Sequence, residues 1–243
     1  MVLNELIQRS PIRIFDQSIN GGLKAGEIGV IASPNGVGKT SVLVQLALDK
    51  LLHGKKVIHV SFTPNRRFEH TQYVPLWYED IFNEFINKKN LENAAEIKND
   101  ILKNRVQMNF SQDGVTLEQI LRSLRAMIIE GGFKADSIII DGFNFSRTTK
   151  ESIKHVKTFA TEMGVIVWYS CSVKDEDSNS GPQYDKENIP VVLGDFSDLI
   201  DVVIVLKPKH DHVELSISKD RDSIISKSMA MKLDPKTLLI LEA

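Results

Sequence analysis

A glycine-rich run that ends in a lysine and two hydroxyl residues carries the clearest chemistry in the sequence. It reads SPNGVGKTS, from Ser33 to Ser41. Gly36 and Gly38 allow backbone conformations that side chains forbid, so main-chain N–H groups can turn toward an anion. Lys39 would then reach the β- and γ-phosphates of a nucleotide, and the Thr40 hydroxyl would be a ligand of Mg²⁺. The residues expected to hold the phosphates are Asn35, Gly36, Val37, Gly38, Lys39, Thr40 and Ser41.

A second candidate is Asp141, which ends the apolar run SIIID at residues 137–141. In open α/β sheets, ligands bind at the carboxyl ends of the strands. A carboxylate at this edge can hold Mg²⁺ through water. An aspartate at a strand end is also a common turn former, so its meaning here depends on the glycine-rich loop. Together they predict a metal site made by Thr40 and Asp141.

The elements that must position these residues follow an alternating pattern of short apolar runs and longer helix-like segments. Such continuous apolar strands with long connections are typical of a mostly parallel sheet covered by helices on both faces, in an α/β fold. Two helices are expected at 40–53 and 116–129, the second opened by a capping box. The predicted strands lie at 28–33, 56–62, 106–110, 137–141, 165–170 and 202–206.

The remaining segments are of a different kind. Residues 64–104 predict a helical insertion, and residues 173–190 predict a long mobile polar loop. The whole chain, 1–243, is expected to form a single domain, because its length is near the upper limit for one core. An antiparallel extension of the sheet is predicted from short strands at 213–218, 228–233 and 237–241.

The composition is that of an ordinary globular chain. With 42% hydrophobic and 26% charged residues, it lies outside the disordered and collagen-like classes. The 30 Lys and Arg residues nearly balance 32 Asp and Glu residues, so no global positive field attracts a nucleic-acid backbone. Cys171 is the only cysteine, which excludes an intramolecular disulfide. Because the sequence has neither a signal-peptide pattern nor a membrane-length apolar run, we expect a cytoplasmic chain without membrane contact.

Four runs of the sequence together resemble the RecA/KaiC-like ATPases, and most closely the ATPase domain of hexameric replicative helicases. They are INGGLKAGEIGVIASPNGVGKTSVLVQLA, VIHVSF, VQMNFSQDGVTLEQI and SIIIDGF, and the similarity covers roughly residues 12–225. The resemblance implies an RecA-like domain that binds ATP and Mg²⁺ between neighbouring subunits. It also implies a homo-oligomer, which in the helicase branch of the family is a hexamer.

The same resemblance assigns a role to Lys219 and Arg221 in SKDRDS. In this family a Lys-x-Arg pair on a late strand reaches the site of the next subunit. On a strand, this spacing puts both cations on one face, as a finger supplied in trans requires. The alternative is a solvated basic pair on an edge strand. The predicted catalytic residues are Lys39, Asp141, Lys219 and Arg221.

The sequence also departs from the family pattern. Ser33 replaces the first glycine of the loop, and Thr63 stands where the family has a catalytic glutamate. Glu69 and Glu79 could replace that base only if the chain between folds back. Cys171 is aligned with a glutamine that senses the γ-phosphate, and a neutral thiol bonds weakly. A positioned base contributes roughly 10² to 10⁴ in rate, so we expect nucleotide binding with slow hydrolysis.

Three functions remain open on these grounds. The first is a slow ATPase whose nucleotide state controls assembly or the binding of a protein partner. The second is a scaffold that binds nucleotide without hydrolysing it. The third is a single-strand DNA helicase or recombinase, which the net charge of −3 on the 173–190 loop disfavours. Trp77 and Tyr78 are interpreted as helix core rather than as base-stacking residues, and His59 as a core histidine.

Overall fold

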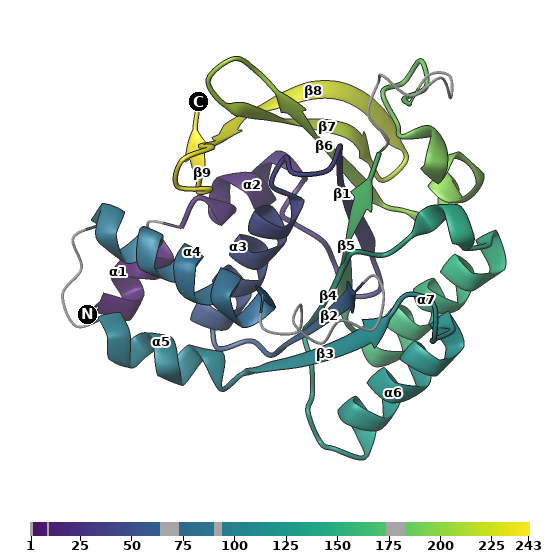
Figure 1. Cartoon of the computed structure of the whole chain (residues 1–243), viewed down its shortest axis with the longest axis horizontal. Coiled ribbons are helices and arrows are strands. Elements are labelled where there is room, and N and C mark those ends of the chain that lie inside the picture. Colours follow the sequence, from purple (N-terminus) through teal and green to yellow (C-terminus); the bar gives the residue numbers. More distant parts are fainter. Residues whose placement is uncertain (1, 9, 64–72, 90–93, 174–182) are drawn as a thin grey trace.

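The computed structural model describes residues 2–8, 10–63, 73–89, 94–173 and 183–243. Within these ranges, nine strands form one sheet in the order β3-β2-β4-β5-β1-β6-β7-β8-β9 (Figure 1). The strands are β1 (Ile28–Ser33), β2 (Val57–Thr63), β3 (Arg105–Ser111), β4 (Ser137–Asp141), β5 (Ile166–Ser172), β6 (Val202–Pro208), β7 (Val213–Asp220), β8 (Ser223–Leu233) and β9 (Ile240–Glu242).

The sheet is parallel from β3 to β6 and antiparallel from β6 to β9. Residues on the central strand β1 are all buried, as expected for a strand that helices cover on both sides. The structure thus confirms an α/β fold with a mostly parallel sheet and an antiparallel C-terminal extension. β7, β8 and β9 form the upper part of Figure 1.

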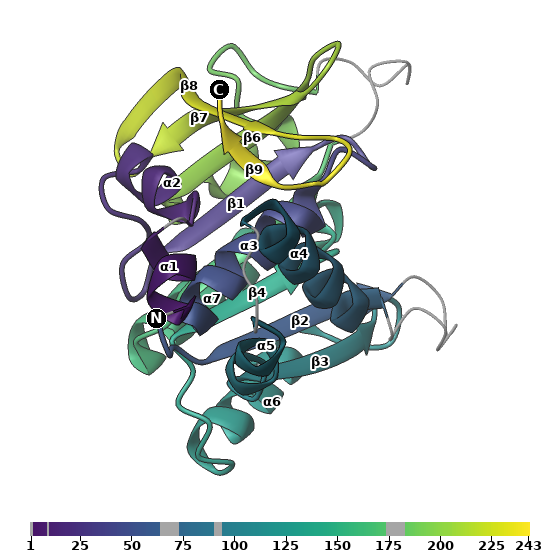
Figure 2. The same cartoon turned by 90° about the vertical axis from the view of Figure 1, so that its left-hand side faces the viewer.

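Helices cover both faces of the sheet. Figure 2 shows the face that carries the helices from the first half of the chain, with α6 and α7 behind the strands. Each face has its own apolar core, one under α3 and one under α6 and α7. The helices are α1 (Val2–Gln8), α2 (Ile12–Ser18), α3 (Lys39–Leu52), α4 (Tyr73–Lys89), α5 (Ala94–Leu102), α6 (Leu117–Ile129) and α7 (Lys150–Met163), with the 3-10 helices η2 (Phe145–Arg147) and η3 (Val191–Leu199).

Both helices that the sequence predicted are present. The N-terminus of α6 has the expected capping box, in which Thr116 and Gln119 exchange side-chain and backbone hydrogen bonds. Helix α7 was not predicted individually, although Thr149 caps its start and Gly164, with φ 67°, ends it. The predicted helical insertion contains α4 and α5. Residues 64–72 and 90–93 of that insertion, and 174–182 of the predicted loop, lie outside the described residues.

The C-terminal strands differ from the prediction in length. β8 begins five residues earlier than expected, because its first half is exposed and carries no buried apolar pattern that could reveal it. β9 begins later, because residues from Asp234 to Leu239 form a turn. In this turn the Leu238 amide donates to the Asp234 carbonyl, and Leu238 has φ 56°.

Candidate functional site

The glycine-rich loop joins the end of β1 to the start of α3, as the sequence predicted. Gly36 and Gly38 have φ values of 77° and 109°, a region that favours glycine. A Cβ on Gly36 would meet no atom within 4 Å, so this side of the loop is open. A Cβ on Gly38 would lie 2.3 Å from Cδ2 of Leu233, so β8 supports the loop from behind.

Lys39 lies in the curve of this loop. Its Nζ donates to the carbonyl oxygens of Ser33 (3.0 Å) and Pro34 (2.8 Å), and the residue is only 8% exposed. The N-cap of α3 is Gly38, which offers no side chain to the N–H groups of the first helical turn. The ammonium group and the positive end of a 14-residue helix therefore face the same small region, a setting that suits an anion.

Thr40 and Asp141 meet although 101 residues separate them. The Thr40 hydroxyl donates to Oδ2 of Asp141 over 2.8 Å, at the carboxyl ends of β1 and β4. Hydroxyl and carboxylate oxygens are the ligand types that Mg²⁺ prefers, and Mg²⁺ keeps several waters beside them. The two predicted metal ligands are thus adjacent. Their part in binding stays a prediction.

Ser41 has a different environment from the rest of the loop. Its side chain is fully buried, and its hydroxyl donates to the carbonyl of Leu238 in the β8–β9 turn. Gln45, one helical turn later, donates to the same carbonyl (2.9 Å) and accepts from the amide of Ile240 (2.8 Å). We call Ser41, Gln45, Leu238 and Ile240 the C-terminal latch. The Ser41 side chain therefore holds the C-terminal turn. The part of Ser41 that remains to bind an anion is its backbone N–H.

The backbone after Asp141 is also held by side chains that the sequence did not single out. Gly142 donates its N–H to the Ser170 hydroxyl (2.8 Å) and accepts at its carbonyl from Nε2 of Gln112 (2.8 Å). Ser170 lies on β5, and Gln112 follows β3. These two residues therefore join the ends of three strands at the candidate metal site.

Lys219 and Arg221 lie at the amino ends of β1 and β6, whereas the glycine-rich loop lies at the carboxyl end of β1. β7 runs antiparallel to β6 and ends beside its start, where Asp220 pairs with Val202. The expectation that both cations share one face of a strand is wrong, because β7 ends at Asp220 and Arg221 lies in the following turn with φ 54°. Lys219 donates to the carbonyls of Ser197 and Ile200.

Arg221 is bonded within its own chain. Its guanidinium makes two hydrogen bonds to Glu27, of 3.0 and 2.8 Å, and one to Asp220. It also donates to the carbonyls of Ile19 and Gly22. In a single chain, these contacts tie the segment before β1 to the β7–β8 turn.

Thr63 and Cys171, where the sequence differs from the pattern it resembles, lie in different surroundings. Thr63 ends β2 beside Ser111, at the expected strand end, but its side chain lies outside the described residues, as does Glu69. Cys171 belongs to the core under α6 and α7, so it does not face the loop. Burial raises the pKa of Cys171 to about 12, against the opposing charge of Lys39, and keeps the thiol neutral.

Aromatic and basic residues form a buried group beneath α4. Nδ1 of His59 lies 3.0 Å from the Tyr78 hydroxyl, and both side chains are fully buried, which confirms that they belong to the core. Burial lowers the pKa of His59 to about 4, so the imidazole is neutral at physiological pH. Its Nε2 has no hydrogen-bond partner among the residues that the structure describes. Trp77 is half-buried and packs against the edge of the same core.

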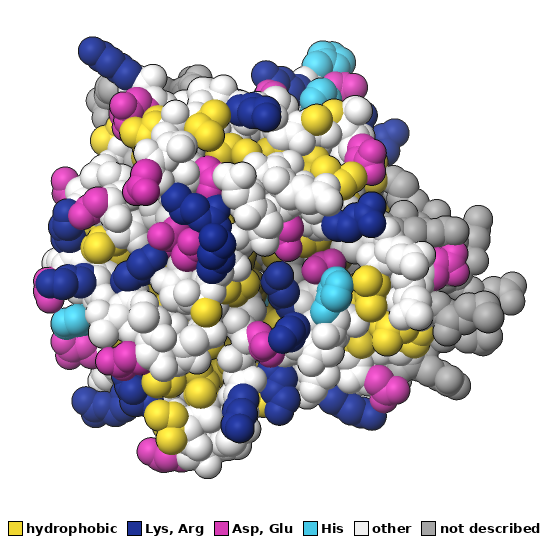
Figure 3. Space-filling view, turned by 180° about the vertical axis from the view of Figure 1, so that it is seen from behind, with side chains coloured by type: hydrophobic (Ala, Val, Ile, Leu, Met, Phe, Trp, Pro, Cys, Tyr) yellow, Lys and Arg dark blue, Asp and Glu magenta, His cyan; other side chains and the backbone are white. Residues whose placement is uncertain are grey.

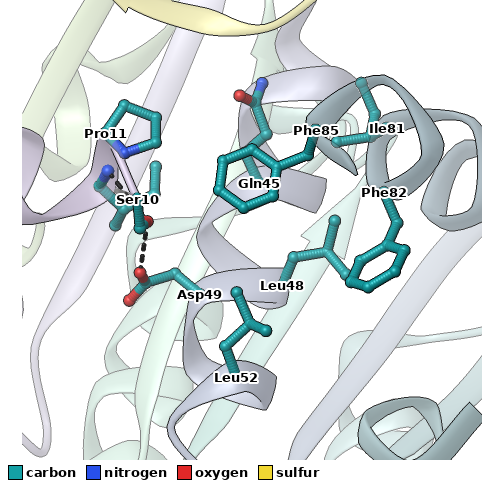
Figure 4. Close-up of a pocket in the computed structure, with 10 residues that line it drawn as sticks. Ser10, Pro11, Gln45, Leu48, Asp49, Leu52, Ile81, Phe82 and Phe85 are labelled. Atoms are coloured by element: carbon teal, nitrogen blue, oxygen red, sulfur yellow. Dashed lines mark hydrogen bonds between the residues drawn. The ribbon is translucent and has the colours of Figure 1, made fainter. Parts of the chain in front are cut away.

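Hollows of different size lie beside α4. The one in Figure 4 lies against the later turns of α3, where Ser10 donates to Asp49, and its volume of about 20 Å³ has room for a water but not for a nucleotide. A groove of about 690 Å³ lies between α4 and the β8–β9 turn, lined by Trp77, Asn83 and Leu238 among others. Leu238 belongs to the C-terminal latch, so this groove begins beside the first turn of α3.

Basic and acidic side chains are intermingled on the face shown in Figure 3. Of the helices described, none is both long and apolar enough to cross a membrane. The described residues hold no cluster of three or more His, Cys, Asp or Glu side chains that could bind a metal alone. No protein-family model and no curated protein matches the chain.

Proposed function

We propose that the chain is a RecA-like P-loop protein that binds ATP with Mg²⁺. The observation that carries this proposal is the hydrogen bond between Thr40 and Asp141 beside the open glycine-rich loop and Lys39. The loop amides and the ammonium of Lys39 would hold the phosphates. Thr40 would bind the metal directly and Asp141 through water. Bound ATP would supply the transferable γ-phosphate.

The groove between α4 and the β8–β9 turn could hold the base and sugar of the nucleotide, because it lies beside the loop. Its volume lies within the range of small-molecule sites. Trp77 is half-buried there and presents an aromatic surface, and Asn83 adds hydrogen-bonding groups. A base in this groove would lie against Leu238, whose carbonyl already bonds to the first turn of α3.

We infer that hydrolysis is slow and that the nucleotide acts mainly as a signal. The residues of β2, β3, β4 and β5 on the α3 side include one carboxylate among the described side chains, and this is Asp141. Glu79 is exposed on α4. Through the C-terminal latch, a change in the loop on nucleotide binding would be passed to the β8–β9 turn. Such coupling suits control of assembly into a homo-oligomer or of binding to a protein partner.

Nucleotide binding is tested by equilibrium dialysis of ATP in millimolar Mg²⁺. Lys39→Ala should weaken binding by about tenfold or more, because it removes charge-assisted hydrogen bonds to phosphate. Asp141→Asn should weaken binding in Mg²⁺ but not in EDTA. The matched control is Lys55→Ala, an exposed lysine beyond the end of α3. Absence of nucleoside triphosphate binding by the wild-type chain contradicts the proposal.

The second candidate is a scaffold that binds ATP without hydrolysing it. It is favoured because Asp141 is the only carboxylate among the described side chains of β2, β3, β4 and β5 on the α3 side. Single-turnover hydrolysis by wild type, Lys39→Ala and Thr63→Glu separates the two functions. For a slow enzyme, the wild-type rate should exceed that of Lys39→Ala, and Thr63→Glu should raise it by about tenfold or more. Equal rates in wild type and Lys39→Ala identify the scaffold.

A further inference from the structure

The turn directly after Asp141 has a backbone conformation that favours glycine. Gly142 has φ 80°, and a Cβ there would lie 3.1 Å from the carbonyl oxygen of Phe62 on β2. The chain therefore turns sharply at the residue that follows the candidate metal ligand. A turn of this kind needs partners for its N–H and its carbonyl, since an unpaired buried group is unfavourable.

A side chain on β5 and one just after β3 supply these partners. Ser170, which is 2% exposed, accepts from the Gly142 N–H, and Gln112 donates to the Gly142 carbonyl, both over 2.8 Å. The β4–β5 register pairs Ile140 with Tyr169, so Ser170 stands next to Asp141 across the ladder. The N–H of Gly142 is thus fixed to the neighbouring strand β5, and its carbonyl to the turn that follows β3.

We infer that Ser170 and Gln112 are positioning residues that orient the Asp141 carboxylate toward Thr40, and that they thereby set how strongly Mg²⁺ enhances nucleotide binding. This inference rests on the proposed function. The orientation of a side chain follows from the backbone that carries it, and the backbone beside Asp141 is fixed at the next residue by these two contacts. Neither side chain needs to touch the nucleotide or the metal.

The effect should therefore be selective. Lys39 and the loop amides do not depend on Gly142, so affinity for ATP in EDTA should be unchanged when Ser170 or Gln112 is replaced. The enhancement by Mg²⁺ uses Asp141 and should fall. A residue with a merely structural role would lower both affinities in parallel.

The test is the ratio of ATP affinities in Mg²⁺ and in EDTA, measured by equilibrium dialysis. Ser170→Ala and Gln112→Met should each reduce this ratio about fivefold, the effect of one lost hydrogen bond. Ser170→Thr keeps the hydroxyl and should restore the ratio. The matched control is Ser172→Ala, an exposed serine on the same strand and face. Gln112 is only half-buried, so its variant carries the test if Ser170→Ala does not fold.

Hydrogen exchange without nucleotide gives a second readout. The Gly142 amide should exchange faster in Ser170→Ala than in wild type or Ser172→Ala. An unchanged affinity ratio in both Ser170→Ala and Gln112→Met, or a parallel loss of both affinities, overturns the inference while leaving the proposed function intact. A wild-type chain that binds no ATP overturns the proposed function, and the inference falls with it.

Discussion

His59 is a buried base in a strand that leads toward the candidate site. Burial lowers its pKa to about 4, while the charge of Asp141 opposes this shift and that of Arg105 adds to it. In the unfolded chain the imidazole takes up a proton near pH 6.5. The folded chain excludes that proton until the pH approaches 4, so stability present above pH 6.5 is lost as the pH falls through this window.

We expect the free energy of unfolding to fall by about 2 kcal/mol between pH 7.5 and pH 5 through His59 alone. His59→Leu should lower stability at pH 7.5, since the Tyr78 hydroxyl loses its partner, but should make this pH dependence shallower. Urea denaturation at both pH values measures the difference. His155→Gln, at an exposed histidine on α7, is the control. The same slope in His59→Leu and wild type contradicts the prediction.

At this scale, residues that work through local spacing were predictable and residues with distant partners were not. Lys39 and Thr40 follow from the loop motif, and Asp141 from the strand that it ends. The latch contact of Ser41 joins residues 197 positions apart, and the ion pair of Arg221 with Glu27 spans 194. No local pattern contains the second partner of such a pair.

At the scale of elements, the hydrogen bonds of the C-terminal latch join α3 to the β8–β9 turn. Gln45 is buried and satisfies both the Leu238 carbonyl and the Ile240 amide. The parallel strands could be predicted because they are nearly continuous apolar runs, and two of the helices because of their apolar spacing and capping residues. The start of β8 and the turn before β9 were missed, since exposure and a left-handed Leu238 leave no such repeat.

Gln45→Ala should reduce the free energy of unfolding by about 2 kcal/mol, because it leaves a buried amide and a buried carbonyl with fewer partners. The amide of Ile240 should then exchange with solvent faster than in wild type. Thermal denaturation and hydrogen exchange measure these effects. Gln17→Ala, at an exposed glutamine on α2, should change neither. Unaltered exchange at Ile240 in Gln45→Ala would show that the latch does not hold β9.

At the scale of the whole molecule, Arg221 connects the segment before the central strand β1 to the antiparallel part of the sheet, at the β7–β8 turn. Asp220 is 4% exposed, and both Asp220 and Glu27 bond to the same guanidinium. A finger supplied to a neighbouring subunit would have to release these contacts. The homo-oligomer and the role of Lys219 and Arg221 in trans stay predictions.

We expect Arg221→Ala to destabilise the single chain by about 2 kcal/mol, because it leaves two carboxylates near the core without their cation. Arg147→Ala, which breaks an exposed pair with Asp113, should have an effect below about 0.5 kcal/mol. Urea denaturation compares the two variants. Equal stabilities would contradict the structural role, and light scattering that shows a monomer with and without Mg-ATP would exclude the role in trans.

The ammonium group of Lys39 is already hydrogen-bonded to backbone carbonyls of its own loop. An incoming anion that takes the ammonium group must displace the carbonyl oxygens of Ser33 and Pro34, which then turn to other donors or to solvent. The heat released on association is therefore the difference between two sets of bonds, and it understates the strength of the new set. A calorimetric binding enthalpy for this chain therefore includes the cost of breaking the contacts of Lys39 with Ser33 and Pro34.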